Sequence, residues 1–346
     1  MLHVGVDLHK RQAQVAVVDD EGTVRTNCAV ACDRDSMRQF FEHLEQPAQV
    51  VMEATSSWYW LCDLLDEMEI EASLSHPLKT KAIASARIKT DKIDAATLAH
   101  LLRTNLLPKA HLASSEARLS RELLRHRAVL VRLRAGVKNR VHALLAKHNL
   151  VYAEGGLFTA KGRDWLAGLA LHPIVRSVLE RMLTLVEVLD LLIEQASAQI
   201  VVRAQDDQAA RLLCTIPGIG YYSALLIAAE IDGVERFPDA RRLCSYAGLV
   251  PSVRASGGHT RLGHITKQGS PWLRWILVET CQKAASRTDF VGEHYRHVAR
   301  RKGNGAAKVA AARKLLKAIY WMLKHGQDFS QVCQYMDNGR NRGELP

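Results

Sequence analysis

The chain opens with His3-Val-Gly-Val-Asp-Leu8 and, after a short polar gap, Gln12-Ala-Gln-Val-Ala-Val-Val-Asp19, and these two runs decide the fold of its N-terminal part. Both runs are rich in valine, a β-branched residue that favours extended strands. A turn pattern at residues 19–22 separates the second run from a third one at residues 23–31. Three consecutive strands joined by short turns predict a meander at the start of a sheet.

Downstream of the meander, strand-like and helix-like segments alternate. Helical patterns are expected at residues 35–45, 57–69, 78–86 and 92–103. Short strands are expected at residues 49–54 and 71–75. This alternation predicts an α/β sheet of mixed strand direction, and residues 108–115 look like a connector to the next part of the chain.

The remainder of the chain has a mostly helical pattern. A long helix is expected at residues 118–150, and after a break near Gly155 and Gly156 the pattern resumes at residues 178–203. Apolar residues recur there at helical spacing, so we expect an antiparallel helical hairpin resembling an irregular coiled coil. From Gly218 to about residue 323 the pattern is helix, turn, a glycine-rich irregular segment and further helices.

Four parts are therefore expected along the chain, and they differ in charge. They are an α/β domain at 1–110, a helical linker at 111–206, a mostly helical C-terminal domain at 207–330 and a tail at 331–346, with disorder expected from residue 338. The 346 residues carry a net charge of +11. Residues 1–115 hold 12 basic and 16 acidic residues, a net of −4, which leaves +15 for residues 116–346. This imbalance favours a nucleic acid as partner, with a solvated basic surface as the alternative.

Composition excludes several other classes of protein. Hydrophobic residues make up 48% of the chain, which fits a globular protein rather than a disordered one. No apolar run approaches the ~20 residues that a membrane span needs. We expect no secretory signal peptide, because no basic segment followed by an apolar one opens the sequence. The seven scattered cysteines lack a CxxC pair, which speaks against a zinc site or disulfide framework and favours the cytoplasm.

Four acidic residues stand where strands end or where a helix begins. Asp7 ends the first strand and Glu53 ends the fourth. Asp91 and Asp94 lie three residues apart at the start of a helix. If the first and fourth strands are neighbours, the four carboxylates meet, and such a cluster needs a compensating cation. Oxygen ligands favour Mg²⁺ or Mn²⁺, and two such ions would suit phosphoryl transfer. Helix capping by Asp91 and a solvated first-turn position for Asp94 are the alternatives.

The segment Ile216-Pro-Gly-Ile-Gly220, followed by a helical run, is typical of the turn in a helix–hairpin–helix element. Gly218 and Gly220 would let the backbone approach a phosphate, which the free N–H groups of the next helix would then bind. Such contacts position DNA without reading its sequence. A tight turn between two packed helices is the alternative.

The long helical pattern at residues 118–147 is unusually basic. It holds nine Lys or Arg against only Glu122, so this helix is expected to bind the phosphate backbone of DNA or RNA. A solvated helical face is the alternative. The candidate binding residues in this helix are Arg118, Arg121, Arg125, Arg132 and Lys138.

The glycine-rich segment Arg254-Ala-Ser-Gly-Gly-His-Thr-Arg261 places Ser256 among cations. Arg254 and Arg261, with Lys267 and Arg274 further along, are candidate phosphate-binding residues. Such cations would also lower the barrier for a serine nucleophile. From the residues alone, a flexible loop that binds phosphate without a covalent role is the favoured interpretation.

In combination, these motifs resemble those of the insertion-sequence 110 transposases and the related Piv DNA invertases. GVDLHK, MEAT and KTDKIDA look like the DEDD motif of that family, with the acids at Asp7, Glu53, Asp91 and Asp94. IPGIG, FPDARRLCSYAGLVP and SGGHTRLGHITKQGSPWLR look like its C-terminal transposase domain. The resemblance runs from residue 3 to about residue 325, and the four acids and Ser256 all match.

The resemblance implies a RuvC-like, ribonuclease-H-type N-terminal domain whose four acids bind Mg²⁺. It implies that Ser256 is a nucleophile that joins the protein covalently to DNA, which reverses the interpretation from the residues alone. It also implies a homo-oligomer, a dimer or tetramer, in which different protomers contribute the two halves of the site. A noncoding bridge RNA that pairs with donor and target DNA is a further implied partner. The resemblance also implies that the protein is a bacterial recombinase that acts in the cytoplasm, in association with the nucleoid.

Two other functions stay open at this stage. A RuvC-type endonuclease that cleaves DNA junctions with metal-activated water would need the four acids but not Ser256. A DNA- or RNA-binding protein without catalysis would show no metal-dependent strand cleavage. Replacing Ser256 by alanine separates the recombinase from the endonuclease.

Overall fold

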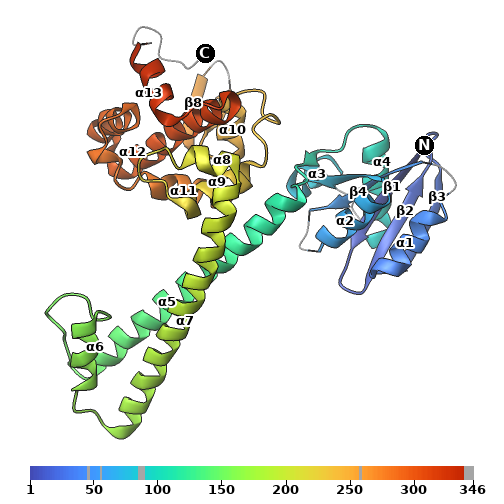
Figure 1. Ribbon diagram of the computed structural model, residues 1–346. Helices are drawn as coiled ribbons and strands as arrows, with labels where there is room; N and C mark the ends of the chain where they lie inside the picture. Colours follow the sequence, from blue (N-terminus) through green and yellow to red (C-terminus); the bar gives the residue numbers. More distant parts are fainter. Residues whose placement is uncertain (45–46, 55–56, 85–89, 257–258, 339–346) are drawn as a thin grey trace. The chain divides into compact units, whose positions relative to one another are not determined.

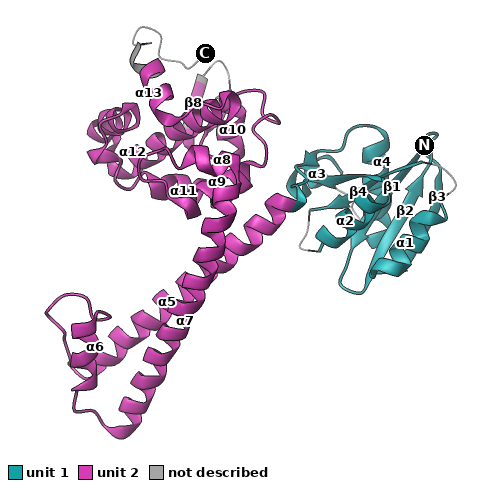
Figure 2. Cartoon of the chain, in the orientation of Figure 1, with its two compact units in different colours: residues 1–115 teal, residues 116–346 magenta. Residues whose placement is uncertain are grey.

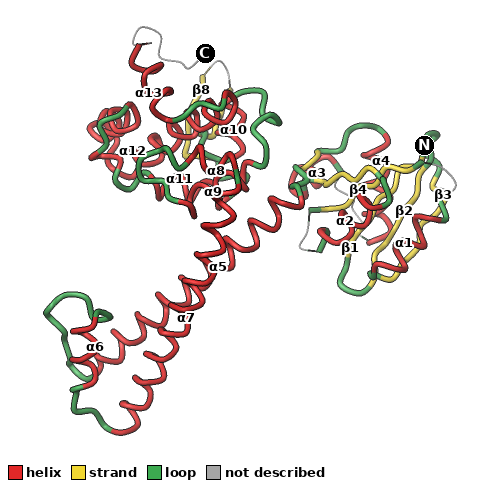
Figure 3. Tube along the Cα trace, viewed as in Figure 1, coloured by secondary structure: helices red, strands yellow, loops and turns green. Residues whose placement is uncertain are grey.

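The structure is a computed structural model that describes residues 1–44, 47–54, 57–84, 90–256 and 259–338 (Figure 1). The chain divides into two compact units, residues 1–115 and residues 116–346 (Figure 2). The first unit contains the sheet, whereas helices dominate the second unit (Figure 3). The expected change from an α/β part to a mostly helical part is therefore confirmed. The predicted disorder of residues 339–346 concerns a segment outside the described residues.

The first unit is built on a six-stranded sheet, formed by described residues, with the order β3-β2-β1-β4-β5-β6. Its strands are β1 (Leu2–Leu8), β2 (Gln12–Val18), β3 (Val24–Ala31), β4 (Ala48–Glu53), β5 (Glu71–Ser75) and β6 (Lys109–Ala110). β1, β2 and β3 form an antiparallel meander, whereas β4 and β5 run parallel to β1. The mixed direction is thus confirmed, and this sheet is compatible with the RuvC-like domain that the resemblance implies. The short β6 lies within the segment expected to be a connector.

Helices cover both faces of this sheet. On one face, α1 (Arg34–Glu42) and α2 (Tyr59–Glu67) pack against a core that includes Val6 and Met52. On the opposite face, α4 (Asp91–Arg103) packs Leu98 against Val51. A further short helix, α3 (Pro77–Ile83), follows β5. Because successive residues of a strand point to opposite faces, β4 supplies side chains to both layers.

Gly5 allows α4 to lie directly on β1. A Cβ at this position would lie 2.0 Å from the carbonyl oxygen of Ala95 and 2.7 Å from the amide nitrogen of Ala99. No side chain fits in that space, so the strand and helix backbones approach each other as closely as glycine permits. This contact keeps the first turn of α4 near the end of β1.

The second unit begins with two long antiparallel helices, α5 (Ser115–Lys147) and α7 (Pro173–Asp206), which lie side by side (Figure 1). Arg134 of α5 pairs with Asp190 of α7 at 2.5 Å, and Leu130 packs with Ile193. The predicted break between them contains a short helix, α6 (Ala160–Ala167). The helical hairpin is therefore present.

The C-terminal helices form the largest core of the chain, around Leu225, Leu277 and Leu315. These helices are α8 (Gln208–Leu213), α9 (Tyr221–Ile231), α10 (Ala240–Tyr246), α11 (Pro271–Thr280), α12 (Phe290–His325) and α13 (Phe329–Asn338), with a 3₁₀ turn at Ala284–Ser286. Within the described ranges, no helix combines the length and the hydropathy needed to cross a membrane.

One prediction about this region is wrong. The glycine-rich segment, expected to be irregular, contains an antiparallel hairpin of β7 (Pro251–Ser256) and β8 (His259–Ile265). The residues that flank the glycines pair across the two strands, from Pro251 with Ile265 to Ser256 with His259. Val253, Thr260 and Ile265 are β-branched residues, which favour such extended strands.

Candidate functional site

Asp7 and Glu53 come together at one edge of the N-terminal sheet. β1 and β4 are parallel neighbours, and Val6 pairs with Met52. Asp7 follows Val6 and Glu53 follows Met52, so the two carboxylates stand at the ends of adjacent strands, at the same edge of the sheet. Gly5 lies two residues before Asp7 and faces α4, which puts Asp7 on that face too. The expectation that the first and fourth strands are neighbours is confirmed.

Asp91, at the start of α4, meets Asp7 across the imidazole of His9. His9 Nε2 lies 3.3 Å from Asp7 Oδ2 and 3.3 Å from Asp91 Oδ2. One ligand atom from each of the three residues lies within 4.8 Å of the other two. Asp7 keeps 13% of its side chain accessible and Asp91 keeps 62%, so the group is anchored in the sheet and open toward solvent. Two carboxylates and an imidazole at this spacing could hold a divalent cation, with the carboxylate oxygens as its hard ligands.

The other two acids lie near this group without belonging to it. Glu53 is half-buried at the strand end, and Asp94 is half-buried one turn into α4. Among the described residues, the group whose ligand atoms all lie within 4.8 Å contains only Asp7, His9 and Asp91.

Asp91 does not cap α4. Thr90 occupies the N-cap position, and its Oγ1 accepts a hydrogen bond from the amide of Ile93 at 3.3 Å. The capping explanation for Asp91 is therefore wrong. The positive end of the helix dipole favours a carboxylate in this first turn, and Asp91 Oδ2 faces His9 from there.

The residues between β1 and β2 add groups that the sequence reasoning missed. A hollow beside the carboxylates is lined by His9, Lys10, Arg11 and Gln14, together with Asp91. The alternation of side chains along a strand could have placed His9 on the same face as Asp7, because it lies two residues after Asp7. Lys10 and Arg11 are exposed and bring two cations to the rim of an acidic site, where a nucleic-acid phosphate would need them.

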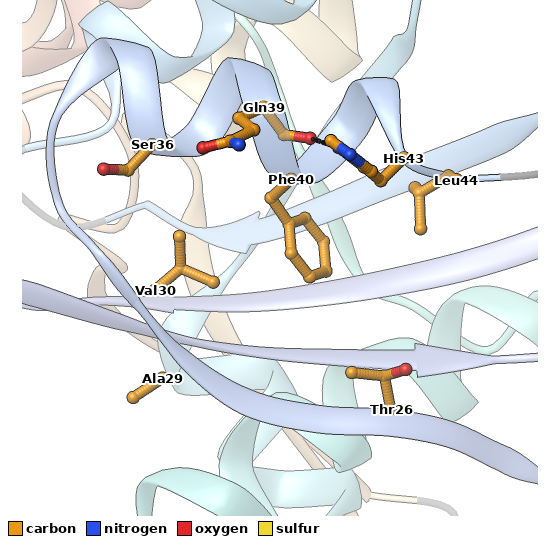
Figure 4. Close-up of a pocket in the computed structure, with 8 residues that line it drawn as sticks. All are labelled: Thr26, Ala29, Val30, Ser36, Gln39, Phe40, His43 and Leu44. Atoms are coloured by element: carbon orange, nitrogen blue, oxygen red, sulfur yellow. Dashed lines mark hydrogen bonds between the residues drawn. The ribbon is translucent and has the colours of Figure 1, made fainter.

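A second hollow on this unit lies between α1 and β3 (Figure 4). Its lining includes Thr26, Val30 and Phe40, and His43 Nδ1 donates a hydrogen bond to the carbonyl oxygen of Gln39 at 2.6 Å. None of its eight lining residues is a carboxylate, and α1 covers the face opposite to α4. This hollow therefore offers no ligand set like that around Asp7.

In the second unit, Ser256 is the exposed last residue of β7. Arg254 pairs directly with Arg261 of β8. Arg254 lies two residues before Ser256, so the hydroxyl and the two guanidinium groups share one face of the hairpin. Like charges directly opposite each other destabilise a strand pair, so this arrangement favours an anion between them. Gly257 and Gly258 lie outside the described residues.

The base of this hairpin is built around close backbone contacts. A Cβ on Gly269 would lie 1.9 Å from the carbonyl oxygen of Tyr246, so only glycine fits there. Arg274 Nη1 donates a hydrogen bond to the carbonyl oxygen of Ala247 at 3.1 Å, and burial lowers the pKa of this guanidinium. Arg274 therefore supports the hairpin base, whereas Lys267 is exposed beside it.

The basic residues of α5 divide into inward-facing and outward-facing groups. Arg118 is only 8% exposed. Arg121 Nε donates to the carbonyl oxygen of Ala229 at 3.0 Å, and Arg125 Nη2 donates to Glu230 Oε1 at 2.7 Å. Arg121 and Arg125 are therefore engaged within the unit, and Arg118 is buried.

Two of the predicted phosphate-binding residues on α5 lie further along the helix. Arg132 is exposed. Lys138 Nζ is half-buried and lies 4.8 Å from the centre of the Phe158 ring. Arg132 is thus the better placed of the two to meet a phosphate backbone.

The turn between α8 and α9 is open to an approaching ligand. Gly218 has a φ of 87°, and apart from chain neighbours no atom of the described residues lies within 4 Å of a Cβ built on Gly218 or Gly220. Gly220 provides the N-cap of α9 without a side-chain hydrogen bond. Arg287 Nη1 donates to the carbonyl oxygen of Pro217 at 2.6 Å and fixes one side of the turn.

Comparisons with known proteins agree with these features. A model of the DEDD transposases of IS110 elements, described as "Transposase", matches residues 4–149, and one described as "Transposase IS116/IS110/IS902 family" matches residues 210–296. Together the two matches account for well over half of the chain. The protein belongs to the IS110 family of insertion-sequence transposases.

Three curated transposases match over nearly their whole length. A "Probable family 20 transposase" of Pseudomonas aeruginosa is 27% identical over 342 residues, which covers 92% of this chain and 96% of the relative. The transposase for insertion sequence element IS1111A of Coxiella burnetii is 26% identical, with 94% and 90% covered. The transposase for IS1328 of Yersinia enterocolitica is 23% identical, with 95% and 98% covered.

Proposed function

We propose that this protein is a DNA transposase that cleaves and exchanges DNA strands, with Asp7, Glu53, Asp91 and Asp94 holding Mg²⁺ or Mn²⁺. The observation that carries this proposal is the grouping of ligand atoms from Asp7, His9 and Asp91 within 4.8 Å. A bound ion there would supply Lewis-acid stabilisation of the charge that develops on a phosphate. Lys10 and Arg11 would hold the DNA backbone beside the carboxylates.

We further propose that Ser256 is the nucleophile. Its Oγ forms a bond to phosphorus while the bond from phosphorus to the leaving sugar oxygen breaks. The hydroxyl proton passes to solvent, and the leaving oxygen takes up a proton. Arg254 and Arg261 share the face of Ser256, so their guanidinium groups would neutralise the charge on the phosphate oxygens. The resulting serine ester conserves the phosphodiester energy and permits rejoining.

The partners in this proposal are donor and target DNA and a noncoding bridge RNA encoded by the element. The net charge of +15 on residues 116–346 and the exposed Arg132 support a nucleic-acid surface on this unit. The open turn at Gly218 and Gly220 would add backbone contacts to phosphate, as in a helix–hairpin–helix element. Recovery of a discrete element-encoded RNA with the purified protein would test the RNA partner.

An oligomer, dimer or tetramer, is part of the proposal. Leu185, Val188 and Leu192 of α7 are exposed, whereas Leu189 and Ile193 pack toward α5. The exposed residues have the three-and-four spacing of a coiled-coil seam, so a second copy of the helical hairpin would cover them. Replacing Leu185 and Leu192 by glutamate should lower the mass measured by light scattering. An unchanged mass would refute this interface.

The four-part division also remains a proposal within this function. Residues 1–110 would be the catalytic RuvC-like domain, 111–206 the coiled-coil linker, 207–330 the domain that carries Ser256, and 331–346 the tail. The activity would take place on nucleoid DNA in the cytoplasm.

Covalent trapping tests the function. Wild type, Ser256→Ala, Asp7→Asn and the control Ser252→Ala, on the same face of β7, are incubated with Mg²⁺, element RNA and labelled DNA, then denatured. We expect a protein–DNA adduct from wild type and Ser252→Ala only. An adduct from Ser256→Ala would refute the nucleophile, and metal-dependent cleavage without any adduct would favour the junction endonuclease. No cleavage by wild type would favour a non-catalytic nucleic-acid-binding protein.

A further inference from the structure

The first turn of α4 is tied to the sheet by two side-chain amides that the proposed function does not use. Gln14 Nε2 donates a hydrogen bond to Asn27 Oδ1 at 2.6 Å. Asn27 Nδ2 donates in turn to the carbonyl oxygen of Lys92 at 3.0 Å. Lys92 lies between the two acidic residues of α4, so the chain of hydrogen bonds ends inside the segment that carries them.

The register of the sheet explains how this chain reaches the carboxylates. Gln14 of β2 pairs directly with Asp7 of β1, and Asn27 of β3 pairs with Ala16. Paired residues point to the same face, and Asp7 faces α4, so both amides lie under the helix. The two hydrogen bonds therefore begin beside Asp7 and cross two strands before they reach α4.

The carbonyl oxygen of Lys92 and the amide of Gln14 together fix which way the Asn27 amide points. The Gln14 side chain is only 8% exposed, and its NH₂ group donates to the Asn27 oxygen. This leaves the NH₂ group of Asn27 to face Lys92, where only a donor satisfies a carbonyl oxygen. The pair thus acts as one oriented unit rather than as two independent polar groups.

Besides the packing of Leu98 against Val51, two contacts hold α4 at separate places along its length. Gly5 permits backbone contact with Ala95 and Ala99 in the middle of the helix. Asn27 holds the N-terminal turn. A helix that is fixed at one point can pivot about it, and a pivot would move Asp91 relative to Asp7 more than it would disturb the core around Leu98. The second point therefore controls the distance between carboxylates on the strand and on the helix.

We propose that Asn27, oriented by Gln14, is a positioning residue of the carboxylate site. It sets the position of Asp91 and Asp94 relative to Asp7, and it thereby sets the affinity of the site for a divalent cation. The inference rests on the proposed function, because it assigns a metal to these acids. Asn27 itself makes no contact with metal or DNA in this scheme.

The test compares Asn27→Ala and Asn27→Asp with Thr26→Ala, a neighbour on the opposite face of β3 that lines the hollow against α1. Aspartate at position 27 can accept from Gln14 but cannot donate to Lys92. Binding of Mn²⁺ to the full-length protein is followed through loss of the free-ion electron paramagnetic resonance signal. We expect both Asn27 variants to need about fivefold to tenfold more Mn²⁺ for half-saturation, the loss typical of one hydrogen bond. Thr26→Ala should match wild type.

Hydrogen exchange and cleavage complete the test. The amides of residues 92–96 should exchange faster in Asn27→Ala, while those of α1 keep the wild-type rate. DNA cleavage by Asn27→Ala should return to near the wild-type rate at saturating Mn²⁺, which general misfolding would not allow. Wild-type Mn²⁺ affinity and exchange in Asn27→Ala would overturn the positioning role. Failure of wild type to bind Mn²⁺ would instead overturn the metal role. The hydrogen-exchange rates would still show whether Asn27 holds the first turn of α4.

Discussion

The two candidate half-sites are built in contrasting ways. Around Asp7, three structural features come together. They are a pair of adjacent parallel strands, a helix in direct backbone contact with β1, and a hydrogen-bonded pair of side-chain amides. Ser256 instead stands at the exposed end of a two-stranded hairpin, and its neighbourhood is defined by a pair of arginines. One site is organised by packing and the other by charge.

This contrast separates two chemical requirements. A divalent cation needs ligand oxygens held at fixed separations, which a packed sheet and helix provide. A nucleophile that must reach a phosphate on DNA needs accessibility and surrounding cations, which an exposed hairpin provides. Substitutions should therefore act through geometry in the first unit and through reactivity or charge in the second.

The largest effect is expected at the carboxylates. Asp7→Asn removes the less exposed of the two carboxylates that lie against His9. DNA cleavage should then fall by about 10³-fold or more, because metal-ion catalysis supplies several kcal/mol. EDTA should abolish cleavage by wild type. Asp35→Asn, which alters an exposed first-turn acid of α1, is the matched control and should cleave normally. Full cleavage by Asp7→Asn, measured under single-turnover conditions, would contradict the metal role.

The next effect concerns the support of the serine hairpin. Glu230 is 2% exposed and bonds to both Arg125 and Ser270, at 2.7 and 2.8 Å. Glu230→Ala removes the carboxylate that pairs with Arg125, whose side chain is 35% exposed, and takes the acceptor away from Ser270, so the second unit should lose about 1–3 kcal/mol of unfolding free energy. Urea denaturation measures this loss, with the exposed Glu279→Ala as control. A loss below about 1 kcal/mol would show that the network is not structural, by the size of an exposed pair.

A third prediction contrasts two glycines. Gly5→Ala forces a methyl group into the backbone of α4, so the first unit should lose about 1–3 kcal/mol, and its Mn²⁺ affinity should fall. Gly136→Ala, in α5, meets nothing within 4 Å and should stabilise the second unit by up to about 1 kcal/mol, as expected for Gly to Ala within a helix. Equal effects of the two substitutions in denaturant titrations would contradict the close packing of α4 on β1.

The smallest effect separates the exposed Arg132 of α5 from Arg125, which is paired with Glu230. Arg132→Ala should weaken DNA and RNA binding equally and reduce the slope of log affinity against log salt by about 1, without changing stability. Arg125→Ala should instead destabilise the unit through Glu230. Binding measured by fluorescence anisotropy at several salt concentrations distinguishes the two. An unchanged slope for Arg132→Ala would remove this residue from the nucleic-acid surface.

Much of the first unit could be predicted because its signals are local. Valine-rich runs and short turns indicated the meander, and the position of Asp7 and Glu53 at strand ends followed from the same runs. His9 was missed although alternation along β1 pointed to it. The amide pair of Gln14 and Asn27 was out of reach, because it depends on the register between strands and on a helix 65 residues away from Asn27.

In the second unit, the charge of the sequence predicted the candidate binding residues less reliably than the strand patterns predicted the acidic site of the first unit. The sequence of α5 shows a basic helix, but it does not show that Arg121 and Arg125 meet Glu230, which lies more than 100 residues further along the chain. The pairing of Arg254 with Arg261 was equally hidden, because the segment was expected to be irregular. Long-range contacts decide which cations remain available to a nucleic acid.

Cleavage of the polypeptide by a bound redox-active ion tests most directly whether a metal binds at the end of β1. Fe²⁺ is exchanged into the wild-type protein, and ascorbate with hydrogen peroxide generates hydroxyl radicals that cut the polypeptide near the bound ion. We expect cuts close to residues 7–9, 53 and 91–94, and we expect them to be suppressed by excess Mg²⁺ and absent in Asp7→Asn. Cuts at other segments, or cuts that Mg²⁺ does not suppress, would contradict a metal site at the end of β1.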